Sequence, residues 1–227
     1  RQRQMCIRDR SKPINFSVPT GNFGDVYAGY LAKKMGLPVN KLLVATNQND
    51  ILHRAISNGN YEAETVSETI SPSMDIQIAS NFERLIFDLN HKNSEQTSKD
   101  MMKIKEEGKY SIDIEKLNLI NQDFLSARMS ETETLDIIKS VYQEFNIVLD
   151  PHTAIGYGAF DKHNLNGNNI VLATAHPCKF PDAIQSAINI KAELPNELQF
   201  ILNEKENYDI LENDIEKVKE HIKDRSK

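Results

Sequence analysis

The sequence predicts an α/β fold, in which a parallel sheet is flanked by helices. The first observation behind this prediction is that short apolar runs suited to buried strands alternate with segments of helical periodicity, an order typical of parallel sheets. The second is size, because 227 residues, of which 39% are hydrophobic, are enough to build the core that such a sheet needs.

The first predicted strand and helix enclose a glycine loop. Apolar residues in 14–18 predict a strand, and 25–35 has helical character before Gly36 and Pro38 stop it. The joining stretch 18–25 reads VPTGNFGD, and its two glycines let backbone N–H groups approach an anion at the positive end of the helix dipole. Because the loop is neither G-x-G-x-x-G nor a Walker A sequence, it predicts a phosphate site unlike the usual nucleotide fingerprints.

The next elements repeat the strand and helix order. KLLVAT at 41–46 predicts a buried strand, and 47–50 opens a helix with Asp50 near its N-terminus. The stretch 59–71 is polar and loop-like, and a helical pattern follows over 72–89. The first third of the chain therefore favours a parallel sheet.

The remaining chain divides by composition. Residues 90–146 are charged with scattered apolar positions, which predicts a helical insertion or small subdomain. Apolar residues at 147–149 mark the return of the sheet, 169–173 its last strand, 181–190 a helix begun by proline, and 211–222 an amphipathic C-terminal helix. The predicted parts are 1–10 as a non-native segment, 11–89 as strand, loop and helix units, 90–146 as the insertion, and 147–227 as the rest of the sheet domain with C-terminal helices.

The first ten residues are unlike the rest of the chain. RQRQMCIRDR is basic and aperiodic, and it resembles translated sequencing-adapter read-through at the end of a metagenomic reading frame. A genuine basic arm is the alternative. We leave this segment out of the fold prediction.

Composition narrows the class of partner. A net charge of -6 disfavours nucleic acid, because that binding draws on Lys and Arg against phosphates. No apolar run approaches the roughly 18 residues of a membrane span, and no signal peptide is evident. Cys6 and Cys178 lie far apart in different contexts, which favours a reducing compartment. We expect a cytoplasmic protein without nucleic-acid or membrane partners.

Polar clusters follow the predicted strands, and they carry the site hypothesis. Their ranges are 20–25, 46–50, 150–153 and 174–177. Because ligands in open α/β sheets bind beyond the carboxyl ends of strands, we expect these clusters to converge. Each also has a structural interpretation: Asn and Asp after a strand often cap helices, and Asp150 with His152 can form a satisfied polar pair. We predict no metal site, since His152 and His176 lack further ligands at helpful spacing, and a Cys178–His nucleophile pair is equally weak.

The strings SVPTGNFGDVYAGYLAKKMGLP, VATNQNDIL, SPSMDIQIASNFERL, DPHTAIG and LATAHPCKFPDAI resemble, in this order, the motifs of threonine synthase. This family consists of pyridoxal 5′-phosphate (PLP) enzymes of fold type II, the tryptophan synthase beta-like fold. The resemblance covers the chain from Ser11 to about Ile190. It implies PLP as cofactor, O-phospho-L-homoserine as substrate, and L-threonine and inorganic phosphate as products.

The resemblance also assigns residues. The cofactor-phosphate loop would comprise Gly21, Asn22, Phe23, Gly24 and Asp25, acting through backbone N–H groups. Thr174 would bond the pyridine nitrogen through its hydroxyl. Residues expected to line or support the site are Asn47, Asn49, Asp50, His152, Thr153 and Arg84. We expect the Asp25 side chain to turn away from the phosphate and to cap the helix or meet a cation.

The family's Schiff-base lysine has no match in this chain. The resemblance puts it in a Phe-Lys-Asp setting upstream of the glycine loop, where only Lys12 stands, in Ser-Lys-Pro. We therefore expect the chain to be a C-terminal fragment that holds no catalytic residue and is inactive alone. The substrate phosphate has weaker candidates in Ser71, Ser73, Asn81 and Arg84.

Two other functions remain open at this point. One is another fold type II lyase, although the Asn-Phe pair in the loop disfavours it. The other is a non-catalytic threonine-synthase-like protein that binds PLP or a phosphorylated metabolite. The sequence does not distinguish a monomer from a homodimer.

Overall fold

The computed structural model describes residues 13–226, which form two compact units, one extending to Glu193 and one beginning at Leu194. The expected non-native segment 1–10 and Lys12 lie outside the described residues. Within 13–226 no helix has the length and apolar character needed to cross a membrane.

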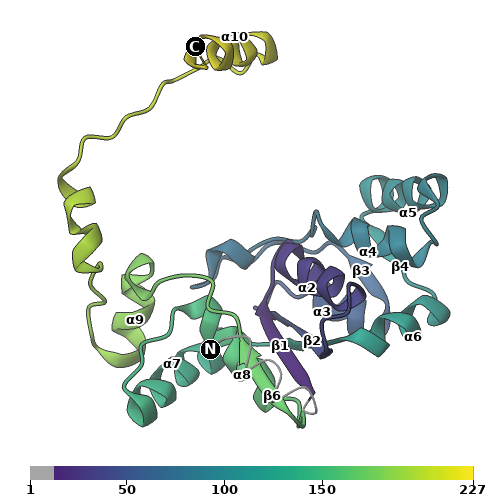
Figure 1. The fold of residues 1–227 in the computed structure, drawn as a ribbon, viewed down its shortest axis with the longest axis horizontal. Helices are drawn as coiled ribbons and strands as arrows, with labels where there is room; N and C mark the ends of the chain where they lie inside the picture. The colour runs from purple at the N-terminus through teal and green to yellow at the C-terminus, as the bar shows by residue number, and fades with distance from the viewer. Residues whose placement is uncertain (1–12, 227) are drawn as a thin grey trace. The chain divides into compact units, whose positions relative to one another are not determined.

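The first unit is built on a four-stranded sheet in which every pairing is parallel (Figure 1). The spatial order is β5-β2-β1-β6. The strands are β1 (Ile14–Pro19), β2 (Val39–Thr46), β5 (Phe124–Arg128) and β6 (Asn168–Val171). The predicted strands at 14–18, 41–46 and 169–173 are thereby confirmed, with small differences at their ends.

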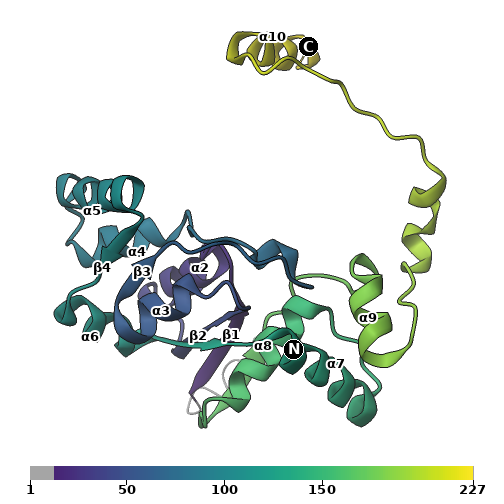
Figure 2. The ribbon, with the colours of Figure 1, turned by 180° about the vertical axis from the view of Figure 1, so that it is seen from behind.

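Helices cover both faces of this sheet, as a parallel sheet requires. Side chains of β2 alternate between the faces, so that Leu42 and Val44 pack with α2 (Gly24–Lys34) and α3 (Ile51–Asn58). Leu43 and Ala45 belong to a second cluster with residues of α8 (Pro151–Asp161). Figures 1 and 2 show α2 and α3 on one side of β1 and β2 and α8 on the other.

A smaller two-stranded antiparallel sheet packs beside the first face. It pairs β3 (Asn60–Glu62) with β4 (Lys109–Ser111). The helices around it are α4 (Phe82–Leu89), α5 (Ser94–Glu107) and α6 (Ile114–Asp123). The helix predicted over 72–89 is wrong as a single element, because only η1 (Pro72–Met74) and α4 are helical and 75–81 is irregular.

Two further expectations need correction. The segment 90–146 is not wholly helical, since β5 lies within it and pairs with β2 in the main sheet. The apolar residues at 147–149 form no strand, because α7 (Glu131–Phe145) ends at Asn146 with a left-handed backbone and α8 begins at Pro151. Val148 and Leu149 pack instead against a cluster formed by Ile138, Ala154 and Ile184 of the surrounding helices.

The predicted helices near the C-terminus are confirmed. They are α9 (Pro181–Ile188), preceded by η2 (Pro177–Lys179), and, in the second unit, α10 (Ile215–Arg225), preceded by η3 (Asn196–Asn203). The last helix begins later than the apolar pattern from Leu211 indicates, because Asp214 caps it by accepting hydrogen bonds from Glu216 N and Lys217 N.

Two glycines that end helices provide a matched pair for a stability test. Gly59 ends α3 with φ 79°, and Gly108 ends α5 with φ 74°. A Cβ on Gly59 would stand 2.7 Å from the carbonyl oxygen of Ile112, whereas nothing lies within 4 Å of one on Gly108. We expect Gly108→Ala to lower the unfolding free energy by about 1 kcal/mol and Gly59→Ala by about 2 kcal/mol, since only the second adds a backbone clash. Urea denaturation measures both, and equal losses would contradict the clash.

Candidate functional site

The glycine loop lies where the sheet's central strands end. It joins β1 to α2, and Thr20 N donates to Ala45 O of β2 at 2.8 Å. None of the N–H groups of residues 21–26 donates a hydrogen bond to another of the residues described. The helical hydrogen bonds of α2 begin with Tyr27 N, which donates to the carbonyl oxygen of the N-cap residue Phe23 at 3.0 Å. The loop therefore offers a row of free donors at a helix N-terminus, which is the arrangement that binds an anion.

Phe23 fixes the shape of this loop. It has φ 67°, in the left-handed region, which costs a side-chain-bearing residue about 1 kcal/mol or more. Its ring is buried and packs against Phe82 and Phe124, with centroid separations of 5.2 and 5.7 Å. Burial of the ring offsets the backbone cost, so the hydrophobic core holds the loop in its bent conformation.

Gly21 fits tightly against a neighbouring turn. A Cβ at Gly21 would stand 2.9 Å from Ser73 O and 3.2 Å from Met74 Cα, and both atoms belong to backbone. Residues 18–26 and Ser73 line a cavity of about 230 Å³. The cavity is therefore bounded by the loop on one side and by the turn at Ser73 on the other.

Asp25 does not behave as expected. The side chain is exposed, α2 has no side-chain cap, and the carboxylate makes no ion pair with another described residue. The prediction that Asp25 caps the helix or meets a cation is therefore wrong. Phe23 occupies the N-cap position, and Asp25 lies in the first turn of α2 without a capping hydrogen bond.

Asn47 and Asn49 follow β2 at the same edge but do not reach into the loop. Asn49 forms a two-point clamp with Ser67, in which Nδ2 donates to Ser67 O and Oδ1 accepts from Ser67 N, both at 2.8 Å. Asn47 Nδ2 lies 2.7 Å from Asp75 Oδ1 and 3.0 Å from Ser71 Oγ. Both asparagines thus support the segment 67–75, which contains the turn beside Gly21.

Asp50 also supports structure elsewhere. It stands at the N-cap of α3 but makes no capping bond. Its carboxylate pairs with Arg54 Nε at 2.9 Å and with Arg128 Nε at 3.5 Å. Arg54 in turn donates to Glu62 O, so the cluster fastens α3 to β3 and β5.

Asp150, His152 and Thr153 form a buried network at the N-terminus of α8. Asp150 caps the helix by accepting from His152 N at 2.9 Å and Thr153 N at 3.4 Å, and it also binds His152 Nδ1 and the Thr153 hydroxyl. Burial raises the pKa of Asp150, but the hydrogen bonds from His152 and Thr153 outweigh it, so the pKa is lowered overall. His152 Nε2 is buried without a hydrogen-bond partner in the described region, and the imidazole ring lies beside the Phe180 ring, with 4.8 Å between the ring centroids.

The charge of Asp150 should be visible in the pH dependence of stability. Since its pKa is lowered by folding, its contribution is present above about pH 4, the range of an unfolded Asp, and is lost as pH falls through the lower folded pKa. Asp150→Asn keeps a capping side chain but removes the charge. We expect it to lower the unfolding free energy by about 1–2 kcal/mol at pH 7 and by progressively less as the pH falls below about 4, as measured by urea denaturation. A pH-independent difference would contradict this role.

Thr174 lies at the same edge of the sheet as the glycine loop. Val171 of β6 pairs with Ser17 of β1, and Leu172 N donates to Ser17 O at 3.0 Å, so Thr174 follows at the level of Thr20. It is exposed, and no hydrogen bond joins its hydroxyl to another of the described residues. The position suits a ligand contact beside the loop.

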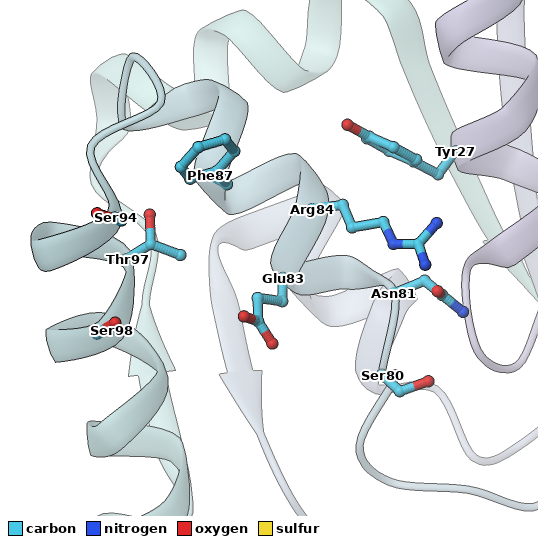
Figure 3. A pocket seen from close by; sticks show the side chains of 9 residues that line it. All are labelled: Tyr27, Ser80, Asn81, Glu83, Arg84, Phe87, Ser94, Thr97 and Ser98. Carbon is cyan, nitrogen blue, oxygen red and sulfur yellow. The ribbon is translucent and has the colours of Figure 1, made fainter.

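Arg84 lines a second cavity that adjoins the loop (Figure 3). This cavity has a volume of about 690 Å³. Figure 3 shows the Arg84 guanidinium extending from α4 toward the Tyr27 ring and Asn81, and its Cζ lies 6.0 Å from the ring centroid. Arg84 is exposed and its guanidinium makes no ion pair with any described carboxylate.

The loop and the Arg84 cavity share a wall. Asn81 N donates to Asn22 O at 3.1 Å, and Ser80 Oγ lies 3.4 Å from Asn22 Oδ1. Burial and the hydrogen bond to Asp88 raise the pKa of Tyr27 to about 12, so the phenol in this wall stays protonated. Arg84, Glu83 and several neutral polar side chains therefore line the cavity beside the loop, whereas the loop's own side chains carry no positive charge.

Sequence reasoning missed two parts of the site. It gave Phe23 a place in the loop but not the role of core anchor, and it overlooked Asp75, which binds four donors. The signals were a large aromatic residue between two glycines and an acid at the end of the Ser-Pro-Ser-Met turn. Neither signal is specific without the partners that the fold supplies.

Known proteins resemble this chain closely. The family model described as threonine synthase, C-terminal, matches residues 153–222. The threonine synthase of Pseudomonas aeruginosa is 42% identical over 214 residues, which is 93% of this chain and 46% of that protein. The PLP-bound threonine synthase of Brucella melitensis superposes with a TM-score of 0.89 at 40% identity, over 99% of this chain and 49% of that one.

The chain belongs to the threonine synthase family. The threonine synthase from yeast agrees, with a TM-score of 0.82 at 38% identity over 94% of this chain and 47% of that one. The predicted fold type II architecture, with its parallel sheet and flanking helices, is thereby confirmed. The chain spans about half the length of the threonine synthases it matches.

Proposed function

We propose that this chain is the part of a PLP-dependent threonine synthase that holds the cofactor phosphate, and that the whole protein converts O-phospho-L-homoserine and water into L-threonine and phosphate. The observation that carries the proposal is the β1–α2 loop, whose free N–H groups line a cavity of about 230 Å³. The likeness to a PLP-bound threonine synthase at 40% identity supports the same assignment.

The residues present suit the phosphate of PLP. Gly21 and Gly24 leave the backbone N–H groups accessible, and a Cβ on Gly21 would already collide with Ser73 O at 2.9 Å. The N-terminus of α2 contributes a partial positive charge, which favours a dianion although Asp25 is nearby. Backbone groups of residues 21–25 would hold the phosphate, and the Thr174 hydroxyl, at the same sheet edge, would meet the ring nitrogen.

PLP, when bound, supplies an electron sink for the pair released as a proton leaves the substrate's α-carbon. The residues of this chain would bind the cofactor and orient it. A hydroxyl at Thr174 would leave the ring nitrogen largely unprotonated, because a hydroxyl is a far weaker acid than a carboxylic acid. Asn47, Asn49 and Asp50 hold surrounding segments, and Asp150, His152 and Thr153 stabilise the start of α8.

The substrate phosphate would bind beside the loop. Arg84 is exposed without an ionic partner and borders the same wall as Ser80 and Asn81, which contact the loop. A guanidinium can bind a phosphate through two parallel N–H bonds, and the neutral donors complete such a site.

We also propose a cytoplasmic protein without nucleic-acid or membrane partners, in keeping with the net charge of -6.

The experiment compares the full-length protein that contains this chain with the 227-residue chain alone. We expect the full-length protein to bind PLP, with a visible absorbance band, and to release threonine and phosphate from O-phospho-L-homoserine. The chain alone should form no threonine, because no residue of this chain matches the Schiff-base lysine of the family. Absence of PLP binding by the full-length protein would overturn the proposal, and binding without threonine formation would favour a non-catalytic relative.

A further inference from the structure

The irregular segment 67–75, which we call the strap, is held almost entirely by side chains. It contains no helix or strand other than η1. Asn49 clamps the backbone of Ser67 at two points, and Glu131 Oε1 accepts from Ile70 N at 2.9 Å. The conformation of the strap therefore depends on a few named polar groups.

Asp75 is the centre of these groups. Its Oδ1 accepts from Asn47 Nδ2 at 2.7 Å, from Asn49 Nδ2 at 2.9 Å and from the Thr69 hydroxyl at 2.7 Å. Its Oδ2 accepts from Thr69 N at 2.8 Å. All four donors are neutral, and Asp75 makes no ion pair with any residue in 13–226. Only a carboxylate can accept on both oxygens, since an amide would present N–H to Thr69 N.

The hydrogen bonds of Asn47 and Asp75 hold both ends of the turn that faces the glycine loop. Ser71, which precedes η1, is buried and lies 3.0 Å from Asn47 Nδ2, and Asp75 follows η1 directly. Met74 N donates to Ser71 O at 2.9 Å, which closes the turn. Ser73 stands in the middle, with its carbonyl 2.9 Å from where a Gly21 Cβ would be, and it lines the loop cavity.

We propose that Asp75 is a positioning residue that sets the width of the cofactor-phosphate cavity by holding the turn at Ser73 against Gly21. The inference rests on the proposed function of the loop. The hydrogen-bond partners of Asp75 are Asn47, Asn49 and Thr69 and include no residue of the loop, so Asp75 acts through η1. Its loss widens the cavity, so it weakens binding of the cofactor's phosphate group and leaves binding of the rest of the cofactor unchanged.

The test compares two ligands of the full-length protein, PLP and pyridoxal, which lacks the phosphate. The ratio of their dissociation constants, pyridoxal over PLP, measures what the phosphate adds. We expect Asp75→Asn to lower this ratio by about tenfold, since one charge-assisted bond is lost and Thr69 N faces a second donor. The dissociation constant of pyridoxal should stay within about twofold.

Asp100→Asn is the matched control. Asp100 is a buried carboxylate that accepts from Asn90 Nδ2 and Gln96 Nε2, both at 2.9 Å, and it lies 4.0 Å from Lys116 Nζ. It belongs to α5 and not to the strap. This variant should lose stability without changing the ratio. Ser71→Ala, which removes the bond at the other end of η1 without altering charge, should lower the ratio in the same direction and serves if Asp75→Asn does not fold.

The outcomes separate the two proposals. If the wild-type full-length protein does not bind PLP, the proposed function fails. If it binds PLP and Asp75→Asn or Ser71→Ala leaves the ratio unchanged, the positioning role is overturned while the function stands. An equal fall of the ratio in Asp100→Asn would also overturn the positioning role, because a general loss of stability would then explain the effect without any change in the strap.

Discussion

Gly21→Val in the full-length protein is expected to reduce threonine formation by about 100-fold or more and to weaken PLP binding in parallel. The added Cβ would meet Ser73 O at 2.9 Å and Met74 Cα at 3.2 Å, and neither backbone atom can rotate away as a side chain can. Either the loop or the turn at Ser73 must move, which displaces the N–H donors from the cofactor's phosphate. PLP titration by absorbance and a threonine assay measure both effects.

Gly29→Ala provides the control for this variant. Gly29 lies on α2, and a Cβ there would stand 3.0 Å from Leu42 Cδ2, the end of a side chain that can adjust. We expect normal PLP affinity and activity in that variant. A Gly21→Val protein that binds PLP as tightly as the wild type would show that the loop does not hold the cofactor.

Arg84→Ala is expected to raise KM for O-phospho-L-homoserine by about 100-fold while leaving the dissociation constant of PLP unchanged. The guanidinium has no ionic partner in the described part of the chain and lies in the cavity beside Ser80 and Asn81. Its removal takes away the cation at the proposed substrate-phosphate site. Arg84→Lys should recover only part of the affinity, because an ammonium group cannot make the paired bonds of the fork.

The control for Arg84 is Lys99→Ala. Lys99 is an exposed cation on α5 that pairs with Glu95 at 2.8 Å and lines neither the loop cavity nor the Arg84 cavity. Its loss removes the same net charge and should leave KM unchanged. Inorganic phosphate should inhibit the wild type competitively and Arg84→Ala more weakly. An unchanged KM in Arg84→Ala would remove Arg84 from the substrate site.

Local sequence patterns predicted the central elements well, because a buried strand requires a run of apolar residues that are consecutive in the sequence. The apolar runs of β1 and β2 and the glycine loop between β1 and α2 are each contained within a few consecutive residues. The same reasoning failed at 147–149, where the apolar side chains pack against helices and form no strand. It also missed β5, whose five residues lie between charged helices in the sequence.

The supporting parts of the site could not be predicted from local patterns, because their partners are distant in sequence. Asp75 reaches back to Asn47 and Asn49, and Phe23 packs against Phe82 and Phe124. Asn47 and Asn49 were expected to line or support the site, and their contacts show that they hold the strap. Only the fold shows which polar residues line the cavity and which hold the segments around it.

Phe23 joins the loop to the hydrophobic core, and this has a thermodynamic consequence. The residue whose backbone bends the loop is also the residue whose ring fills the space between Phe82 and Phe124. An anion that binds only the bent loop therefore stabilises the folded core by mass action. A substitution that loosens the packing of the three rings is therefore expected to weaken anion binding, because a smaller fraction of the folded protein then holds the loop in the conformation that the anion binds.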